Sequence, residues 1–245
     1  MAELHLKDLS PQRDPSLRFD LVVPSGGFIG LFGASGAGKT TLLHLIAGLE
    51  ERGTGQVLIG GEDQTEWPAH RRGVTLLFQD HNLFEHMTVF ANIALGITTG
   101  TPTPAEHVAV TRAIDQVGLT GLEDRLPHQL SGGQQGRVGL ARCLMRRRGV
   151  LLLDEPFAAL DPPLRYDMAH LLAALRQEHR MTVVVVSHDL APLMAHADGA
   201  APLQDGRLGA IMTWAQIAQD PRLASYGAGL TSQSAHFSAE SPAMP

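Results

Sequence analysis

Cysteine is nearly absent from this sequence, in which Cys143 is the single example. One cysteine forms no intramolecular disulfide, and alone it makes no structural zinc site. No stretch approaches the roughly 20 consecutive apolar residues that are needed to cross a bilayer. The start of the chain alternates polar and apolar residues and lacks the basic start and apolar run of a signal peptide. We therefore expect a soluble protein of a reducing compartment.

An excess of positive charge is also missing, because 19 Lys and Arg residues stand against 25 Asp and Glu residues, for a net charge of −6. We predict no nucleic-acid partner, since general affinity for phosphate backbones needs basic charge. The 245 residues are 44% hydrophobic and 18% charged, which is typical of a globular protein and not of a disordered or fibrous one. This length fits one large domain, or one domain with a subdomain.

Apolar patterning predicts alternating strands and helices. Strands are predicted at residues 4–9, 17–23, 28–32, 57–59, 74–78, 150–153 and 182–186, and helices at 40–49, 134–148 and 164–178. Residues 10–16 are typical of a turn. The last two strands are almost wholly apolar, which indicates a parallel sheet covered by helices on both faces. Residues 82–148 have a helical pattern that Pro102 and Pro104 interrupt.

A glycine-rich loop follows the third predicted strand and precedes a predicted helix. It fits the phosphate-loop pattern G-x-x-x-x-G-K-[ST] at every position, and a glycine-rich turn that matches by chance would lack this context. Its residues are Gly33, Ala34, Ser35, Gly36, Ala37, Gly38, Lys39 and Thr40, followed by Thr41. Glycines let backbone N–H groups point at phosphate oxygens, and the helix N-terminus adds its dipole. Lys39 would contact the β- and γ-phosphates, and the Thr40 hydroxyl would bind Mg²⁺.

A pair of carboxylates, Asp154 and Glu155, ends the buried strand at residues 150–153. The carboxyl ends of strands are where α/β sheets place ligand chemistry. Asp154 would hold Mg²⁺ directly or through water, and Glu155 would orient or deprotonate an attacking water. A lone pair of such carboxylates is often only a solvated strand end. Its position after a buried strand, in a chain with a phosphate loop, favours the catalytic interpretation.

Further motifs resemble those of one family. The run Leu130, Ser131, Gly132, Gly133 and Gln134 resembles the signature motif of ABC transporter ATPases. Gln79 resembles their Q-loop glutamine, Asp161 falls in a segment like their D-loop, and His188 matches their switch histidine. The motifs follow the family's order from Gly33 to His188. The resemblance implies an α/β, P-loop NTPase fold with a mostly parallel core sheet, an antiparallel β part and a helical signature subdomain.

The same resemblance implies a mechanism. Two ATPase subunits would form a head-to-tail homodimer around two ATP molecules, with the phosphate loop of one facing the Ser131 motif of the other. Gln79 would sense Mg²⁺ and water, and His188 would contact the γ-phosphate and help to hold Glu155. The remaining histidines, among them His81, are given no role by position.

The chain also resembles bacterial importers in having one ATPase domain. We expect that domain at residues 1–225, with the helical subdomain at about 82–148 and a loose tail at 226–245. Residues 71–84 resemble the Q-loop region of thiamine-importer ATPases. An importer implies a membrane permease, an indirect periplasmic substrate-binding protein and a place on the cytoplasmic face of the inner membrane. Importers of iron, sulfate or polyamine and non-transport ABC ATPases are the alternatives. A simple P-loop kinase would leave Ser131 and His188 unexplained.

Two departures from the family stand out. The family places an aromatic ring on adenine, but residues 10–18 contain no aromatic residue. We expect Arg13 to supply a guanidinium plane instead, or adenine to be held loosely. Gly136 lies inside a predicted helix, where glycine costs up to about 1 kcal/mol relative to alanine. We expect it to loosen the signature helix without removing a catalytic group.

Overall fold

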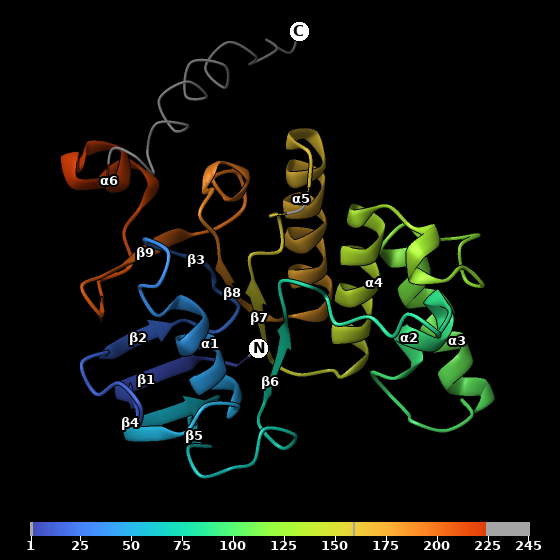
Figure 1. The fold of residues 1–245 in the computed structure, drawn as a ribbon, viewed down its shortest axis with the longest axis horizontal. Helices are drawn as coiled ribbons and strands as arrows, with labels where there is room; N and C mark the ends of the chain where they lie inside the picture. Colours follow the sequence, from blue (N-terminus) through green and yellow to red (C-terminus); the bar gives the residue numbers. More distant parts are fainter. Residues whose placement is uncertain (1, 159, 224–245) are drawn as a thin grey trace, which may run out of the picture.

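The computed structural model describes residues 2–158 and 160–223. Figure 1 shows a larger lobe with both sheets and a lobe of helices beside it. In chain order the strands and α-helices are β1 (Leu4–Pro11), β2 (Phe19–Val23), β3 (Phe28–Phe32), α1 (Lys39–Ala47), β4 (Arg52–Ile59), β5 (Glu62–Asp63), β6 (Val74–Leu77), α2 (Val89–Ala94), α3 (Pro104–Gln116), α4 (Gly132–Met145), β7 (Val150–Asp154), α5 (Pro162–His179), β8 (Thr182–Val186), β9 (Gly199–Gln204), β10 (Arg207–Leu208) and α6 (Trp214–Gln219).

A six-stranded sheet forms the centre of the larger lobe, in the order β10-β9-β3-β8-β7-β6. Its pairs are parallel except for β10 with β9. Alternate residues of β7 and β8 enter two different cores. Leu151 and Val183 pack with α4 and α5, whereas Leu152 and Val184 pack with α1. The prediction of a parallel sheet buried on both faces is therefore confirmed.

A second, antiparallel sheet has the order β2-β1-β4-β5. The alternation that predicted β1 and β2 places Leu4, Leu6, Phe19 and Leu21 in one core with α1. The sheet therefore covers the side of α1 that the parallel sheet does not. The predicted turn at 10–16 is wrong at its start, because Ser10 and the following proline extend β1 by pairing with β4.

The helical lobe contains α2, α3 and α4. Pro104 begins α3 instead of breaking it, since proline suits the first turn of a helix and Thr103 and Glu106 form a capping box ahead of it. α4 begins at Gly132, two residues before its predicted start, because Ser131 caps it. It ends at Met145, before the predicted residue 148.

The segment after β8 was not assigned from the sequence. It adds β9 and β10 to the open side of β3, followed by α6. The tail predicted at residues 226–245 lies outside the described residues. Within the described ranges, no helix combines the length and the apolar character that a membrane span requires.

Candidate active site

The phosphate loop connects β3 to α1, and its glycines meet local steric demands. Gly36 and Gly38 adopt left-handed φ values of 80° and 100°. Gly33 lies so close to β9 that a Cβ on it would be 2.2 Å from the carbonyl oxygen of Leu203. The other positions of the loop are partly or fully exposed: Ala34, Ser35, Ala37 and Thr41. The loop is therefore curled as the motif predicted and is accessible to a ligand.

Lys39, the first residue of α1, spans this loop. Its Nζ donates to the carbonyl oxygens of Gly33 at 2.8 Å and Ala34 at 2.9 Å. Gly38 is the N-cap of α1, and no side chain caps this end of the helix. The first N–H groups of α1 therefore face the loop without a side-chain acceptor. A cation, an uncapped helix N-terminus and a glycine cradle together fit the phosphates of a nucleotide.

A possible metal position lies between α1 and the end of β7. The hydroxyl of Thr40 donates to Oδ2 of Asp154 at 2.8 Å. Asp154 is 5% exposed, and its other oxygen, Oδ1, is buried without a hydrogen-bond partner among the described residues. Buried carboxylate oxygens need a partner. The Thr40 hydroxyl and the Asp154 carboxylate are hard oxygen ligands, and Oδ1 still lacks a partner. The pair therefore fits Mg²⁺ or a water bound to it.

Glu155 and His188 meet at the carboxyl ends of β7 and β8. Oε2 of Glu155 lies 2.9 Å from Nδ1 of His188 and accepts from its backbone N–H at 3.3 Å. Glu155 has a left-handed φ of 47°, and its own N–H bonds to Val186. A non-glycine residue in this region is strained and is held by its surroundings. The carboxylate and the imidazole predicted to act together are therefore in contact.

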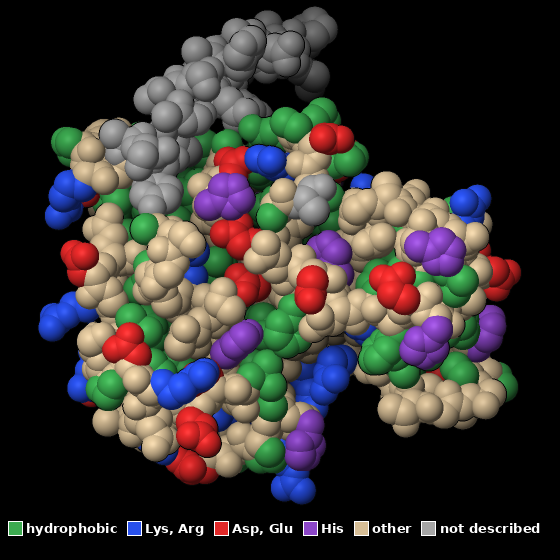
Figure 2. All heavy atoms as spheres, viewed as in Figure 1, with side chains coloured by type: hydrophobic (Ala, Val, Ile, Leu, Met, Phe, Trp, Pro, Cys, Tyr) green, Lys and Arg blue, Asp and Glu red, His purple; other side chains and the backbone are tan. Residues whose placement is uncertain are grey.

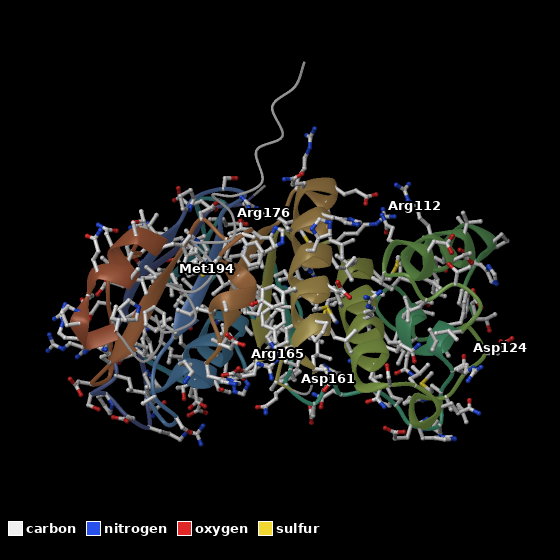
Figure 3. All side chains as sticks on the ribbon, turned by 90° about the horizontal axis from the view of Figure 1, so that it is seen from above. Arg112, Asp124, Asp161, Arg165, Arg176 and Met194 are labelled. Atoms are coloured by element: carbon white, nitrogen blue, oxygen red, sulfur yellow. The ribbon has the colours of Figure 1, made fainter. Side chains whose placement is uncertain are left out.

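Arg165, in the first turns of α5, connects the predicted D-loop with the loop that carries His188. Its Nε donates to the Leu160 carbonyl at 2.9 Å, and its Nη1 pairs with Asp189 at 2.8 Å. Figure 3 shows Arg165 and Asp161 at the same end of α5. The remaining D-loop residue, Ala159, lies outside the described residues. Sequence reasoning did not single out Arg165.

The signature motif forms the N-terminus of α4. Ser131 Oγ accepts from the Gln134 N–H at 3.3 Å, and the Gln134 side chain accepts from the Ser131 N–H at 2.9 Å. Gly132 and Gly133 are the first two residues of the helix. A cavity of about 260 Å³ adjoins the motif, lined in part by Ser131, Gly133 and Gln134. The motif is thus a capped, accessible helix start.

Gln79 lies two residues beyond β6 and is exposed. The loop that follows is fixed by two residues that sequence reasoning missed. Asn92, fully buried in α2, bonds to the N–H and carbonyl of Phe84 and to two further carbonyls. Arg142 of α4 donates to the carbonyls of His81 and Asn82. A buried asparagine and a helical arginine carry no pattern that would have revealed these contacts.

The structure brings the phosphate loop, Asp154, Glu155 and His188 together in one lobe. The signature motif lies on α4 in the other lobe (Figure 1). One chain therefore does not place its own Ser131 on its own phosphate loop.

Arg13, which is expected to supply a guanidinium plane for adenine, pairs with a carboxylate in this structure, and its stacking role stays a prediction. Its Nε donates to Glu50 at 2.7 Å, and a second nitrogen pairs with the same carboxylate. Glu50 follows the C-terminal end of α1, about 13 Å along a nine-residue helix from the phosphate loop. Leu17 lies beside the loop instead, with Cδ1 3.1 Å from where a Cβ on Gly38 would be. An apolar side chain, and not a guanidinium, therefore borders the loop.

The phosphate loop follows β3 at the carboxyl ends of the parallel strands, and the carboxylate–histidine pair lies at the ends of the neighbouring strands β7 and β8. These features define a P-loop nucleotide-hydrolysing protein. The family described as ABC transporter matches residues 17–158. This chain belongs to the ABC transporter family. Membership implies ATP binding, ATP hydrolysis coupled to transport and a membrane permease partner.

Similar proteins come from several bacteria and carry one name, thiamine import ATP-binding protein ThiQ. The protein of Chelativorans sp. (strain BNC1) is 51% identical over 175 residues, 71% of each chain. That of Histophilus somni (strain 129Pt) is 44% identical over 78% of this chain and 90% of its own. That of Escherichia coli (strain K12) is 46% identical over 78% of this chain and 83% of its own.

Proposed function

We propose that this chain is the ATP-hydrolysing subunit of a bacterial thiamine importer that acts on thiamine or its phosphates. The observation that carries the hydrolytic part is the contact of Glu155 with His188 at the strand ends beside the phosphate loop. The substrate rests on the similarity to the thiamine import proteins. An importer of another nutrient is the alternative, since no residue of this chain touches the transported molecule in this arrangement.

The chain's own groups divide the chemistry among them. The glycines and Lys39 would bind the phosphates, and Thr40 with Asp154 would hold Mg²⁺, which supplies charge neutralisation at the phosphates. ATP supplies the γ-phosphate bond that is broken. Glu155 takes a proton from the attacking water or orients it, and His188 keeps the carboxylate in place through Nδ1. Gln79 would complete the metal and water contacts from just beyond β6.

The separation of the two motifs within one chain supports a homodimer. The uncapped helix start at Lys39 and the capped one at Ser131 are both N-termini that favour anions. A two-fold, head-to-tail pair would place each phosphate loop opposite the partner's signature motif and make two identical sites. ATP would then be shared between subunits, and its hydrolysis would release them.

A groove of about 360 Å³ between the lobes suits the permease. Its walls come from β6, the end of α1, α2 and α4, and it contains apolar side chains with two arginines: Leu49, Leu76, Phe78, Leu95, Arg142 and Arg146. Figure 2 shows basic side chains in the hollow between the lobes. Leu49 is 53% exposed, and exposed apolar surface rimmed by charge is typical of an interface. We place a short cytoplasmic helix of the permease here, which would hold this chain at the inner face of the bacterial inner membrane. A periplasmic binding protein would act on the other side.

The hydrolytic role is tested with Glu155→Gln. Because the phosphate-binding groups are untouched, ATP affinity should be unchanged, while turnover falls by about 10²–10⁴-fold. Glu3→Gln, an exposed glutamate before β1, is the matched control and should keep full turnover. Normal turnover in Glu155→Gln would remove this residue from the mechanism.

The transport role is tested in the source bacterium. Tagged Glu155→Gln chain with ATP should recover an integral-membrane permease, and loss of the chain should abolish thiamine uptake. Recovery of a permease with normal thiamine uptake would keep the transport ATPase and discard the substrate. Recovery of soluble proteins alone would contradict permease binding by this chain.

A further inference from the structure

The segment after Gln79 takes an unusual backbone path that the signature helix holds in place. His81 and Asn82 both have left-handed φ values, 59° and 46°. Non-glycine residues adopt this region at a cost. Arg142 of α4 stabilises it by donating to both carbonyls, at 2.6 Å from Nη2 and 2.9 Å from Nη1. The backbone beside Gln79 is therefore bonded to the signature helix.

The His81 side chain fits a notch in that helix. It is 7% exposed, and a Cβ on Gly136 would lie 3.4 Å from its Nε2 and 3.5 Å from its Cε1, with Cε of Met168 on the same space at 3.3 Å. A Cβ on Gly139 would lie 3.4 Å from its Cβ. These two glycines are three residues apart, so they share one face of α4. We name the space they leave the glycine notch.

Shape, and not hydrogen bonding, places the imidazole. Nδ1 of His81 is buried with no hydrogen-bond partner among the described residues. Glycine is unfavourable inside a helix, but a Cβ at 136 would already be in contact with this ring and with Cε of Met168, so a side chain longer than that of alanine would press on them. The glycine that departs from the family's pattern thus accommodates a histidine to which position gave no role.

We propose that His81 is a positioning residue, which seats in the glycine notch and keeps the Gln79 loop in fixed register with the signature helix. Gln79 lies two residues before His81, and Ser131 lies five before Gly136 on the same helix. The proposal rests on the proposed function, in which Gln79 serves the chain's own ATP and Ser131 serves the partner's. A rigid link between them would make the two ATP sites of a dimer respond together.

The full chain with His81→Ala tests this link. ATP affinity, measured with a non-hydrolysable analogue, should stay within about twofold because the phosphate loop is untouched, while kcat falls about tenfold from misplacement of Gln79. Amide exchange of residues 80–84 should become about tenfold faster without any nucleotide. An unchanged kcat together with unchanged exchange would overturn the proposal.

A double-variant cycle tests the fit itself. Gly136→Ala should raise Tm by about 2–4 °C in the His81→Ala background, where the alanine gains helix propensity and meets no ring. In the unaltered chain the added methyl would also contact the ring at 3.4 Å, so the gain should be smaller. Gly139→Ala is the control, since its Cβ would lie 2.8 Å from Leu77 Cδ1 and should lower Tm in both backgrounds. Equal Tm shifts for Gly136→Ala in the two backgrounds would overturn the notch. Absence of ATP hydrolysis in the unaltered chain would instead overturn the proposed function, and these two readouts would still decide on His81.

Discussion

Arg72 should contribute more to stability than any surface arginine, because it is a buried cation that satisfies four carbonyl groups. It is 6% exposed. Nη1 donates to the carbonyls of Leu45 and Ile46 at 2.6 and 2.9 Å, at the C-terminal end of α1. Nη2 and Nε donate to Thr65 and Trp67 at 2.6 and 3.0 Å. One guanidinium thus joins the end of α1 to the segment between β5 and β6.

The expected loss follows from opposing contributions. Each hydrogen bond from a charged donor contributes about 1.5–3 kcal/mol, and the cation also favours the C-terminal end of the α1 dipole. Burial costs several kcal/mol in lost hydration and lowers the Arg72 pKa. Arg72→Met would keep an unbranched apolar side chain in place of the aliphatic part of Arg72 but leave the four carbonyls without their hydrogen-bond donor. We expect a net destabilisation of about 3–5 kcal/mol.

Urea unfolding and thermal melting measure this loss. For a protein of this size, 3–5 kcal/mol corresponds to a fall in Tm of about 6–20 °C. Arg71→Met is the matched control, because Arg71 is exposed and surface changes usually stay within about 0.5 kcal/mol. Arg72→Lys should recover only part of the loss, since an ammonium cannot reproduce the planar fork. If Arg72→Met and Arg71→Met unfold within 1 kcal/mol of each other, the buried-cation reasoning is refuted.

Three further changes have defined outcomes. Asn92→Leu removes the four hydrogen bonds that the Asn92 side chain makes to residues 84–88 and should cost about 2–4 kcal/mol in urea unfolding; a loss below 1 kcal/mol would contradict this. Thr182→Val deletes a fully buried hydroxyl that bonds two backbone groups, and should cost about 1–3 kcal/mol by the same measurement. Burial, aided by His170, lowers the pKa of His196. The neutral ring therefore contributes its full stability above about pH 6.5, and this stability is lost as the pH falls through the folded pKa. His196→Gln should therefore reduce the slope of Tm against pH between pH 7.5 and 5.5. An unchanged slope would refute the assignment.

The central elements were predictable because their sequences are locally consistent. The apolar runs of β7 and β8 predict strands that are buried on both faces. The phosphate loop before Lys39 is predictable because all its phosphate-binding residues are adjacent in the sequence. Asp154 is the last residue of β7 and Glu155 follows it, so their place at the end of the strand needed no tertiary information. β9 is not predictable in the same way, since Gly199–Gln204 contains a proline and has no β-branched or aromatic residue, and it is a strand because β3 offers it an edge.

The failures share a physical cause, which is that a side chain's partner can lie far along the sequence. Arg13 and Glu50 are 37 residues apart and pair across the end of α1, a contact that the charge and planarity of Arg13 alone did not predict. The same holds for Arg72, whose acceptors are backbone carbonyls. Backbone acceptors have no residue type, and no sequence pattern announces them.

Gly136 shows how a single residue is misread when its neighbour in space is unknown. Taken as a helix residue, it signals a weaker helix. Taken with His81, it provides room for the imidazole ring, while Gly139 on the following turn lies against the Cβ of the same histidine. α4 loses helix propensity at this one position, and in return the loop beside Gln79 packs against the helix that begins after Ser131. The lost helix propensity at Gly136 and the fixed position of the loop at His81 are then one feature of the fold. Comparing the Tm of Gly136→Ala with and without His81 separates the effect of helix propensity from the effect of the contact.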